Sequence, residues 1–217
     1  MRLTNISKNN NKSIILFFNG WGMDDRVIAH INHTKYDVVM FNEYHNFNFD
    51  KSILDGYEQI FIVAWSLGVW VANNIIQSHN VKVNKTIAIN GTLQPIDNLK
   101  GISFDIFQGT IDNWNESTRT KFQTRMFKSR QIFSQNINKL PIRTIAEQKD
   151  ELIALQKAIL SQTLESAIWD KVYCGTDDLI FGHINQKQAW QNASNIIDKE
   201  MSHFPFLELN NWDTIVE

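Results

Sequence analysis

The sequence has few of the residues that build cross-linked or membrane-spanning proteins. A single cysteine, Cys174, excludes an internal disulfide framework and any zinc site that needs several cysteines. No apolar run approaches the roughly 20 residues that cross a bilayer, so no membrane partner is expected. The polar first residues contain no hydrophobic signal core, so we expect a cytoplasmic protein.

The sequence also has no large excess of charge of one sign and no flexible linker. The 21 basic and 23 acidic residues give a net charge of −2, which argues against a general nucleic-acid binder. Only three prolines and nine glycines interrupt the chain, and none of its stretches has the composition of a linker. The 217 residues therefore suit one domain, 1–217, with a small insertion. Hydrophobic residues make up 43% and aromatic residues 12%, enough for a large core that excludes global disorder.

Short apolar runs separated by helical stretches predict a sheet. Strands are expected at Ser13–Phe18, Tyr36–Phe41, Ile60–Trp65, Lys85–Asn90 and Lys171–Gly175. Helices are expected at Leu67–Gln77, Thr118–Phe127, Ser129–Asn136, Ile145–Leu160 and near Gln186–Ile197. Continuous apolar strands that alternate with helices indicate an α/β fold, with a mostly parallel sheet covered on both faces. The long stretch between the last two strands is interpreted as a helical cap insertion, about 95–168, over one edge of the sheet.

The most informative motif is Ala64-Trp65-Ser66-Leu67-Gly68, between a predicted strand and a predicted helix. A tight strand-to-helix turn strains the backbone of its serine and leaves room only for small residues two positions before and after it. Such a turn projects the Ser66 hydroxyl as a nucleophile and points the Leu67 N–H toward a developing oxyanion. The alternative is that Ser66 only caps the helix, since serine is a favoured N-cap residue.

A second turn, Asn19-Gly20-Trp21-Gly22, follows the first predicted strand. Its glycines allow the backbone to approach a substrate carbonyl, so the Trp21 N–H is the candidate for a second oxyanion donor. The alternative is an ordinary turn at the end of a strand, because Asn-Gly is common in such turns.

The partners of a nucleophilic serine on such a turn are expected in the chain order serine, acid, histidine. Asp177 and Asp178 directly follow the last predicted strand, and Asp178, just before an apolar pair, is preferred. Either aspartate could instead only cap a turn. His203 is the candidate base because it lies late in the chain before an apolar Pro-containing turn. His183 is too near Asp178 in sequence, and the remaining histidines precede the acid: His30, His33, His45 and His79.

Together these motifs resemble the α/β-hydrolase fold, and more closely the BioG-type esterases of biotin synthesis. The stretches that are similar to that family are Phe18–Asp24, Ala64–Gly68, Ala88–Thr92, Gly101–Thr110, Lys121–Met126 and Ser202–Phe206. The resemblance spans nearly the whole chain. Ala64 stands where many hydrolases have glycine, and Asn19 stands where many have histidine.

The resemblance implies a carboxylesterase that cleaves the methyl ester of pimeloyl-acyl-carrier protein, releases methanol and ends elongation of the acyl chain. In that mechanism Ser66 attacks the ester, His203 accepts its proton and Asp178 orients the imidazole. No metal or organic cofactor is needed. The aliphatic chain is expected between the cap and the sheet, against Trp21 and Trp65.

The predicted cap carries charge of one sign. Seven basic residues occur without an Asp or Glu between Glu116 and Glu147; they are Arg119, Lys121, Arg125, Lys128, Arg130, Lys139 and Arg143. A basic face suits an acyl carrier protein, which is acidic, so the first five are expected to contribute to substrate binding. The alternative is a solvated helix face. A nucleic-acid partner is not expected, since no binding motif accompanies these charges.

Two other functions are compatible with the same residues. A general short-chain esterase or thioesterase would use the same three side chains without a carrier protein. A non-catalytic binding protein could also retain a hydrolase scaffold, because a fold does not determine a function.

Overall fold

A twisted sheet forms the centre of the computed structural model, which describes residues 1–162 and 169–217. The order of its seven strands is β1-β3-β2-β4-β5-β6-β7. Their bounds are β1 Arg2–Ser7, β2 Ser13–Phe18, β3 Asp37–Asn42, β4 Gln59–Trp65, β5 Lys85–Ile89, β6 Lys171–Gly175 and β7 Ile196–Lys199. Only β1 is antiparallel to its neighbour, β3, and the other pairs are parallel.

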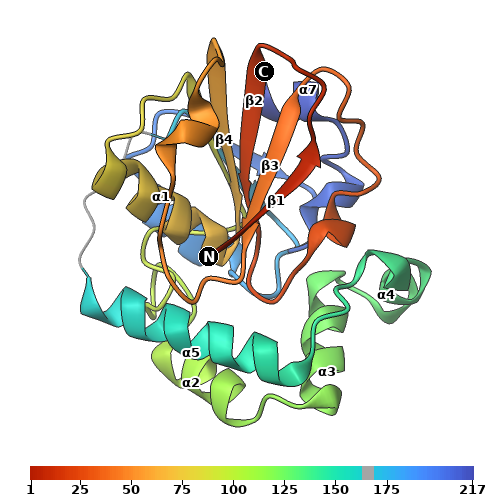
Figure 1. Cartoon of the computed structure of the whole chain (residues 1–217). Coiled ribbons are helices and arrows are strands. Elements are labelled where there is room, and N and C mark those ends of the chain that lie inside the picture. Colours follow the sequence, from red (N-terminus) through yellow and green to blue (C-terminus); the bar gives the residue numbers. More distant parts are fainter. Residues whose placement is uncertain (163–168) are drawn as a thin grey trace.

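Helices cover both faces of the sheet (Figure 1). The helices next to the sheet are α1 Leu67–His79, α6 His183–Ala189 and α7 Trp212–Val216. In β2, Ile14, Leu16 and Phe18 join one buried core with residues of α1. Ile15 and Phe17 point to the other face and pack in a second core with residues of α7. Burial on both faces is why β2 is apolar throughout and has no polar alternation.

The cap lies between β5 and β6 and covers the carboxyl ends of the parallel strands (Figure 1). Its helices are α2 Phe104–Asp112, α3 Glu116–Met126, α4 Arg130–Gln135 and α5 Ile145–Ser161. Short 3-10 helices occur at Asp25–Val27, Lys51–Leu54, Ile137–Lys139 and Pro205–Leu207. The last part of the predicted insertion, 163–168, lies outside the described residues. We propose one domain with an inserted cap, since the strands that flank the insertion pair directly with each other.

The mostly parallel sheet confirms the predicted α/β class, and all five predicted strands are present as β2–β6. Strands β1 and β7 were not predicted from the sequence, because both lie at sheet edges and lack a fully buried apolar run. Helices α2 and α7 were not predicted either. The helix expected near Gln186–Ile197 is wrong in its second half, where Ile196 and Ile197 pair with β6 as strand β7.

In the described part of the chain, no helix is long and apolar enough to cross a membrane.

Candidate active site

Ser66 lies in the sharp turn between β4 and α1. Its backbone has φ +58° and ψ −129°, a left-handed conformation that is strained for a residue with a side chain. The hydroxyl makes no capping hydrogen bond to the helix. The alternative in which Ser66 acts only as an N-cap is therefore wrong, because the backbone of the turn directs the side chain away from the first helical N–H groups.

Close backbone contacts explain the small residues around this turn. A Cβ atom on Gly68 would lie 2.4 Å from the Phe18 carbonyl oxygen and 2.5 Å from that of Asn19. A Cβ atom on Gly91 would lie 2.2 Å from the Ser66 carbonyl oxygen. The first turn of α1 thus packs directly on the ends of the neighbouring strands. Gly91, which follows β5, was not recognised from the sequence as part of this packing.

The structure brings Ser66, His203 and Asp178 together at the carboxyl ends of the strands. His203 Nε2 lies 3.0 Å from Ser66 Oγ, and His203 Nδ1 lies 2.9 Å from Asp178 Oδ2. An ionised carboxylate can only accept, so it favours the tautomer with the proton on Nδ1 and leaves Nε2 free to accept from the serine. All three residues are buried.

Asp178, rather than Asp177, contacts the imidazole. Asp178 Oδ1 accepts from the N–H groups of Ile180 and Phe181, at 2.8 and 2.9 Å. Asp177 instead accepts from Lys128 Nζ at 2.6 Å, and this hydrogen bond raises the pKa of Lys128. The two adjacent aspartates therefore face different surroundings, one at the buried histidine and the other toward the cap.

Several side chains without a predicted role hold the segment of His203. Asn90 Nδ2 donates to the carbonyl groups of Ser202 and His203 at 2.8 and 3.2 Å, and Asn90 Oδ1 accepts from Gly175 N at 2.7 Å. The Phe181 ring stacks on the imidazole, with centroids 6.0 Å apart and planes 12° apart. An Asn-Gly pair directly after a strand was the only local sign of the role of Asn90.

Trp65 lines the cavity beside Ser66, as its predicted role in substrate binding requires. Its Nε1–H is engaged elsewhere, because it donates to the His203 carbonyl oxygen at 2.8 Å. The indole therefore supports the histidine segment and offers only its apolar surface to the cavity.

Most backbone N–H groups in the turn after β2 are engaged in hydrogen bonds. The N–H of Asn19 donates to Phe41 O and that of Gly20 to Asn19 Oδ1, at 3.0 and 2.9 Å. The next engaged groups are the N–H of Gly22, which donates to a carboxylate of the cap, and the N–H of Met23, which donates to Gly20 O. Within the residues that the structure describes, the Trp21 N–H has no acceptor.

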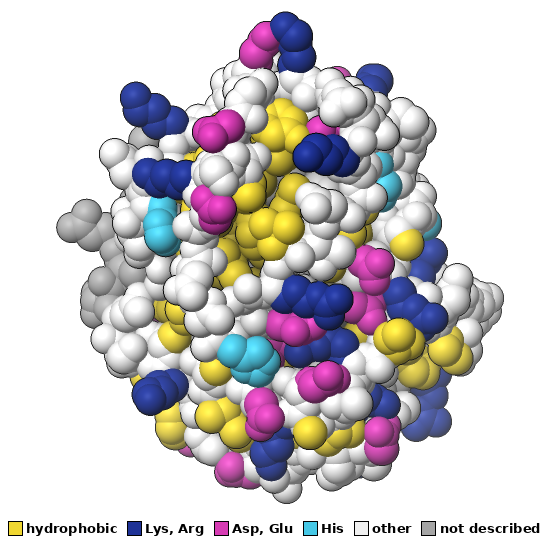
Figure 2. All heavy atoms as spheres, in the orientation of Figure 1, with side chains coloured by type: hydrophobic (Ala, Val, Ile, Leu, Met, Phe, Trp, Pro, Cys, Tyr) yellow, Lys and Arg dark blue, Asp and Glu magenta, His cyan; other side chains and the backbone are white. Residues whose placement is uncertain are grey.

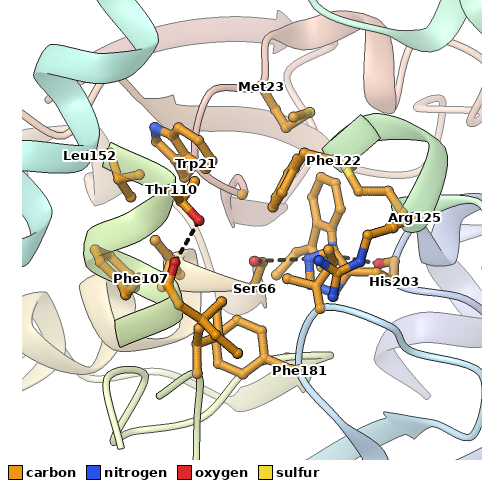
Figure 3. Close-up of a pocket in the computed structure, with 17 residues that line it drawn as sticks. Trp21, Met23, Ser66, Phe107, Thr110, Phe122, Arg125, Leu152, Phe181 and His203 are labelled. Carbon is orange, nitrogen blue, oxygen red and sulfur yellow. Dashed lines mark hydrogen bonds between the residues drawn. The ribbon is translucent and has the colours of Figure 1, made fainter. Parts of the chain in front are cut away.

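The cavity above Ser66 is narrow and mostly apolar, with a volume of about 50 Å³. Its walls come from the sheet ends and from the cap, and Figure 3 shows Ser66 and His203 facing each other at its centre. Apolar side chains that line it include Trp21, Met23, Leu67, Phe107, Phe122, Leu152 and Phe181. Among the described residues, no group of three or more His, Cys, Asp or Glu side chains is arranged to hold a metal ion.

The basic residues of the cap divide into paired and unpaired groups. Arg143 is buried in an ion pair with Glu151, so its inclusion in a basic surface is wrong. Arg119 pairs with Glu116, and Lys128 pairs with Asp177.

The described residues provide no ion-pair partner for Lys121, Arg125 or Arg130, which are exposed. Arg125 also lines the cavity and donates to Leu179 O at 2.5 Å. Figure 2 shows acidic and basic side chains interspersed over the cap on the face in view, so that face does not carry charge of a single sign.

Comparison with known proteins identifies one family over most of the chain. The model of the family described as pimeloyl-ACP methyl esterase BioG matches residues 1–215. The crystal structure of BioG from Haemophilus influenzae superposes with a TM-score of 0.92 at 30% identity, and the match covers 100% of both chains. An esterase from Exiguobacterium antarcticum has a TM-score of 0.69 at 12% identity, covering 95% of this chain and 90% of that one, which shows the α/β-hydrolase fold alone.

Two curated relatives are similar in sequence. A protein of Haemophilus influenzae without a described function is 32% identical over 204 residues, 93% of each chain. A malonyl-[acyl-carrier protein] O-methyltransferase of Bacteroides fragilis is 39% identical over 188 residues. That match covers 87% of this chain but only 38% of the relative, so the relative's name does not assign methyl transfer to the matched part.

Proposed function

Because the chain belongs to the BioG family, we propose that it hydrolyses pimeloyl-[acyl-carrier protein] methyl ester to pimeloyl-[acyl-carrier protein] and methanol in biotin biosynthesis. The observation that carries the proposal is the hydrogen bond of 3.0 Å between Ser66 Oγ and His203 Nε2, at the wall of an apolar cavity. An oriented serine–histidine pair is the arrangement that activates a hydroxyl for attack on an ester.

In the proposed reaction, Ser66 Oγ attacks the ester carbonyl while His203 Nε2 takes the serine proton. Asp178 holds the Nδ1–H tautomer and stabilises the imidazolium that forms. The N–H groups of Trp21 and Leu67 donate to the oxyanion, and the lack of an acceptor for the Trp21 N–H among the described residues supports this role. His203 then protonates methanol as it leaves and activates the water that hydrolyses the acyl-enzyme.

The acyl chain is proposed to lie in the cavity between the cap and the sheet, against the apolar surfaces of Trp21 and Trp65. Acyl carrier protein is the proposed partner. Among the five basic residues predicted to bind it, Lys121, Arg125 and Arg130 are the stronger candidates. Arg119 and Lys128 already have carboxylate partners, and a new partner would have to compete with these.

Replacement of the serine tests the proposed reaction. Ser66→Ala should abolish release of methanol from the carrier-bound methyl ester, and should fail to complement a strain that lacks the pimeloyl methyl esterase. Ser78→Ala is the matched control, because Ser78 lies at the far end of α1 from Ser66 and its hydroxyl donates to Asn74 Oδ1 at 3.1 Å. Turnover retained by Ser66→Ala would refute the mechanism. Failure of a fluorophosphonate to label Ser66 in the unaltered protein would favour a non-catalytic binding protein.

Neutralising basic residues of the cap tests whether acyl carrier protein is the partner. Lys121→Gln combined with Arg130→Gln should lower kcat/KM on the carrier-bound ester at low salt, because complementary charges speed encounter and are screened by salt. The same variant should hydrolyse a free methyl ester at the normal rate. Lys157→Gln, an exposed change on α5, is the control. Equal rates of the double variant and the wild type on the carrier-bound ester would favour a general esterase.

A further inference from the structure

Helix α5 of the cap holds the turn that carries Trp21 through three long-range hydrogen bonds. The Trp21 indole Nε1–H donates to the Gln148 carbonyl oxygen at 2.7 Å. The Gln148 side chain returns a hydrogen bond from Nε2 to the Gly22 carbonyl oxygen at 2.9 Å. The Gly22 N–H donates to Glu151 Oε2 at 3.2 Å. Trp21 is thus held through its side chain and through the residue that follows it.

The carboxylate in this contact is fully buried. Glu151 forms an ion pair with Arg143 and also accepts from the Tyr44 N–H at 3.1 Å. Burial raises the pKa of Glu151, and the nearby Arg143 opposes that rise. Burying a charge pair costs desolvation energy that a purely apolar contact would avoid, so attachment of the cap alone does not require it. The Glu151 carboxylate of this pair provides oxygens that accept from the backbone N–H groups of Gly22 and Tyr44.

The conformation of Gly22 makes this arrangement specific. Gly22 has φ +73°, and a Cβ atom there would lie 3.2 Å from Gln148 Nε2. Both peptide groups that flank Trp21 are therefore held: the Gly20 carbonyl oxygen accepts from the Met23 N–H at 3.3 Å, and the Gly22 N–H donates to Glu151. Between these contacts lies the Trp21 N–H, beside the cavity, for which the described residues provide no acceptor.

We propose that Gln148 and Glu151 are positioning residues that aim the Trp21 N–H at the oxyanion, so that docking of the cap completes the oxyanion hole. The inference rests on the proposed esterase function. It predicts an effect on the transition state with little effect on binding of the ester, because the ester carbonyl gains most of its negative charge only after attack.

Gln148→Met tests this role, because it removes the donor to Gly22 O and keeps both the volume and the backbone acceptor for Trp21. Gln156→Met is the matched control on the same helix. Gln156 Nε2 donates to Gln108 Oε1 at 2.9 Å, which lies within the cap. Hydrolysis of a small soluble methyl ester is measured for each, and the enzyme concentration is fixed by titrating Ser66 with a fluorophosphonate.

We expect kcat of Gln148→Met per titrated site to fall about tenfold, less than the loss of a whole oxyanion donor, with KM within about twofold. A boronic acid that mimics the tetrahedral intermediate should bind about tenfold more weakly. Gln156→Met should match the wild type in both measurements. Gly22→Ala places a methyl group against Gln148 Nε2 and so disturbs the hydrogen bond between Gln148 and Gly22 from the side of the turn. It should give the same loss of kcat.

The outcomes separate the two proposals. If the wild type does not hydrolyse the ester and Ser66 is not labelled, the proposed function fails and the inference fails with it. If hydrolysis depends on Ser66 but Gln148→Met keeps the kcat of Gln156→Met, only the positioning role is overturned. A lower melting temperature with unchanged kcat per titrated site would likewise overturn it, because it would show a purely structural role.

Discussion

Replacing Asp178 with asparagine should disable the histidine without changing the shape of the site. Asp178 Oδ1 accepts two backbone N–H groups, so the amide oxygen of Asp178→Asn will take that position. The amide NH2 group then faces His203 Nδ1 and the Gln186 Nε2–H, which both contact Oδ2 in the wild type. His203 must present Nδ1 as an acceptor and carry its proton on Nε2, where it cannot take the proton of Ser66.

The size of the effect follows from the loss of the productive tautomer. An equivalent change in a serine–histidine–aspartate site lowers kcat by about 10⁴, which is about 5 kcal/mol of transition-state stabilisation. The variant should also lose about 1–3 kcal/mol of stability, because Gln186 Nε2 loses its acceptor in Asp178 while its donation to Phe181 O, at 2.6 Å, remains.

Turnover of a free methyl ester per titrated site is the assay, and Asp177→Asn is the matched control. Asp177 contacts Lys128 rather than His203, so its loss should leave kcat within about threefold, as for an exposed ion pair of low energy. A wild-type kcat in Asp178→Asn, or a large loss confined to Asp177→Asn, would refute the reasoning.

Three further predictions concern stability. Gly68→Ala should lower the free energy of unfolding by about 3 kcal/mol in urea titrations, since its Cβ meets backbone oxygens of β2 and the turn after it. Burial opposes ionisation of Asp37, but hydrogen bonds from Asn9, Tyr57 and Asn11 outweigh it and lower its pKa. Asp37→Asn should therefore melt at a lower temperature than the wild type at pH 7, and this difference should vanish as pH falls below about 3.8 through the lowered pKa. Trp65→Phe should cost more than about 1 kcal/mol in the same urea titrations, because it removes the hydrogen bond to the His203 carbonyl and also leaves unfilled space in the core.

The parallel strands could be predicted because each lies between two covered faces. Burial on both sides requires apolar residues at every position, and that pattern is local, as in Ser13–Phe18. The turn at Ser66 was predictable for a similar reason, since its backbone strain and close packing act on adjacent residues. The edge strands β1 and β7 carry a weaker pattern because one side of each has no neighbouring strand.

Local sequence therefore determined the class of fold, the strained serine and the order of its possible partners. Only the tertiary structure showed that Asp178, and not Asp177, contacts His203, and that Arg143 is buried. It also showed that the cap contacts the turn at Trp21. These outcomes depend on contacts between segments far apart in the chain, such as Gln148 with Gly22. A residue's type and its neighbours in sequence do not specify which distant donor or acceptor it meets; packing of the cap against the ends of the strands does.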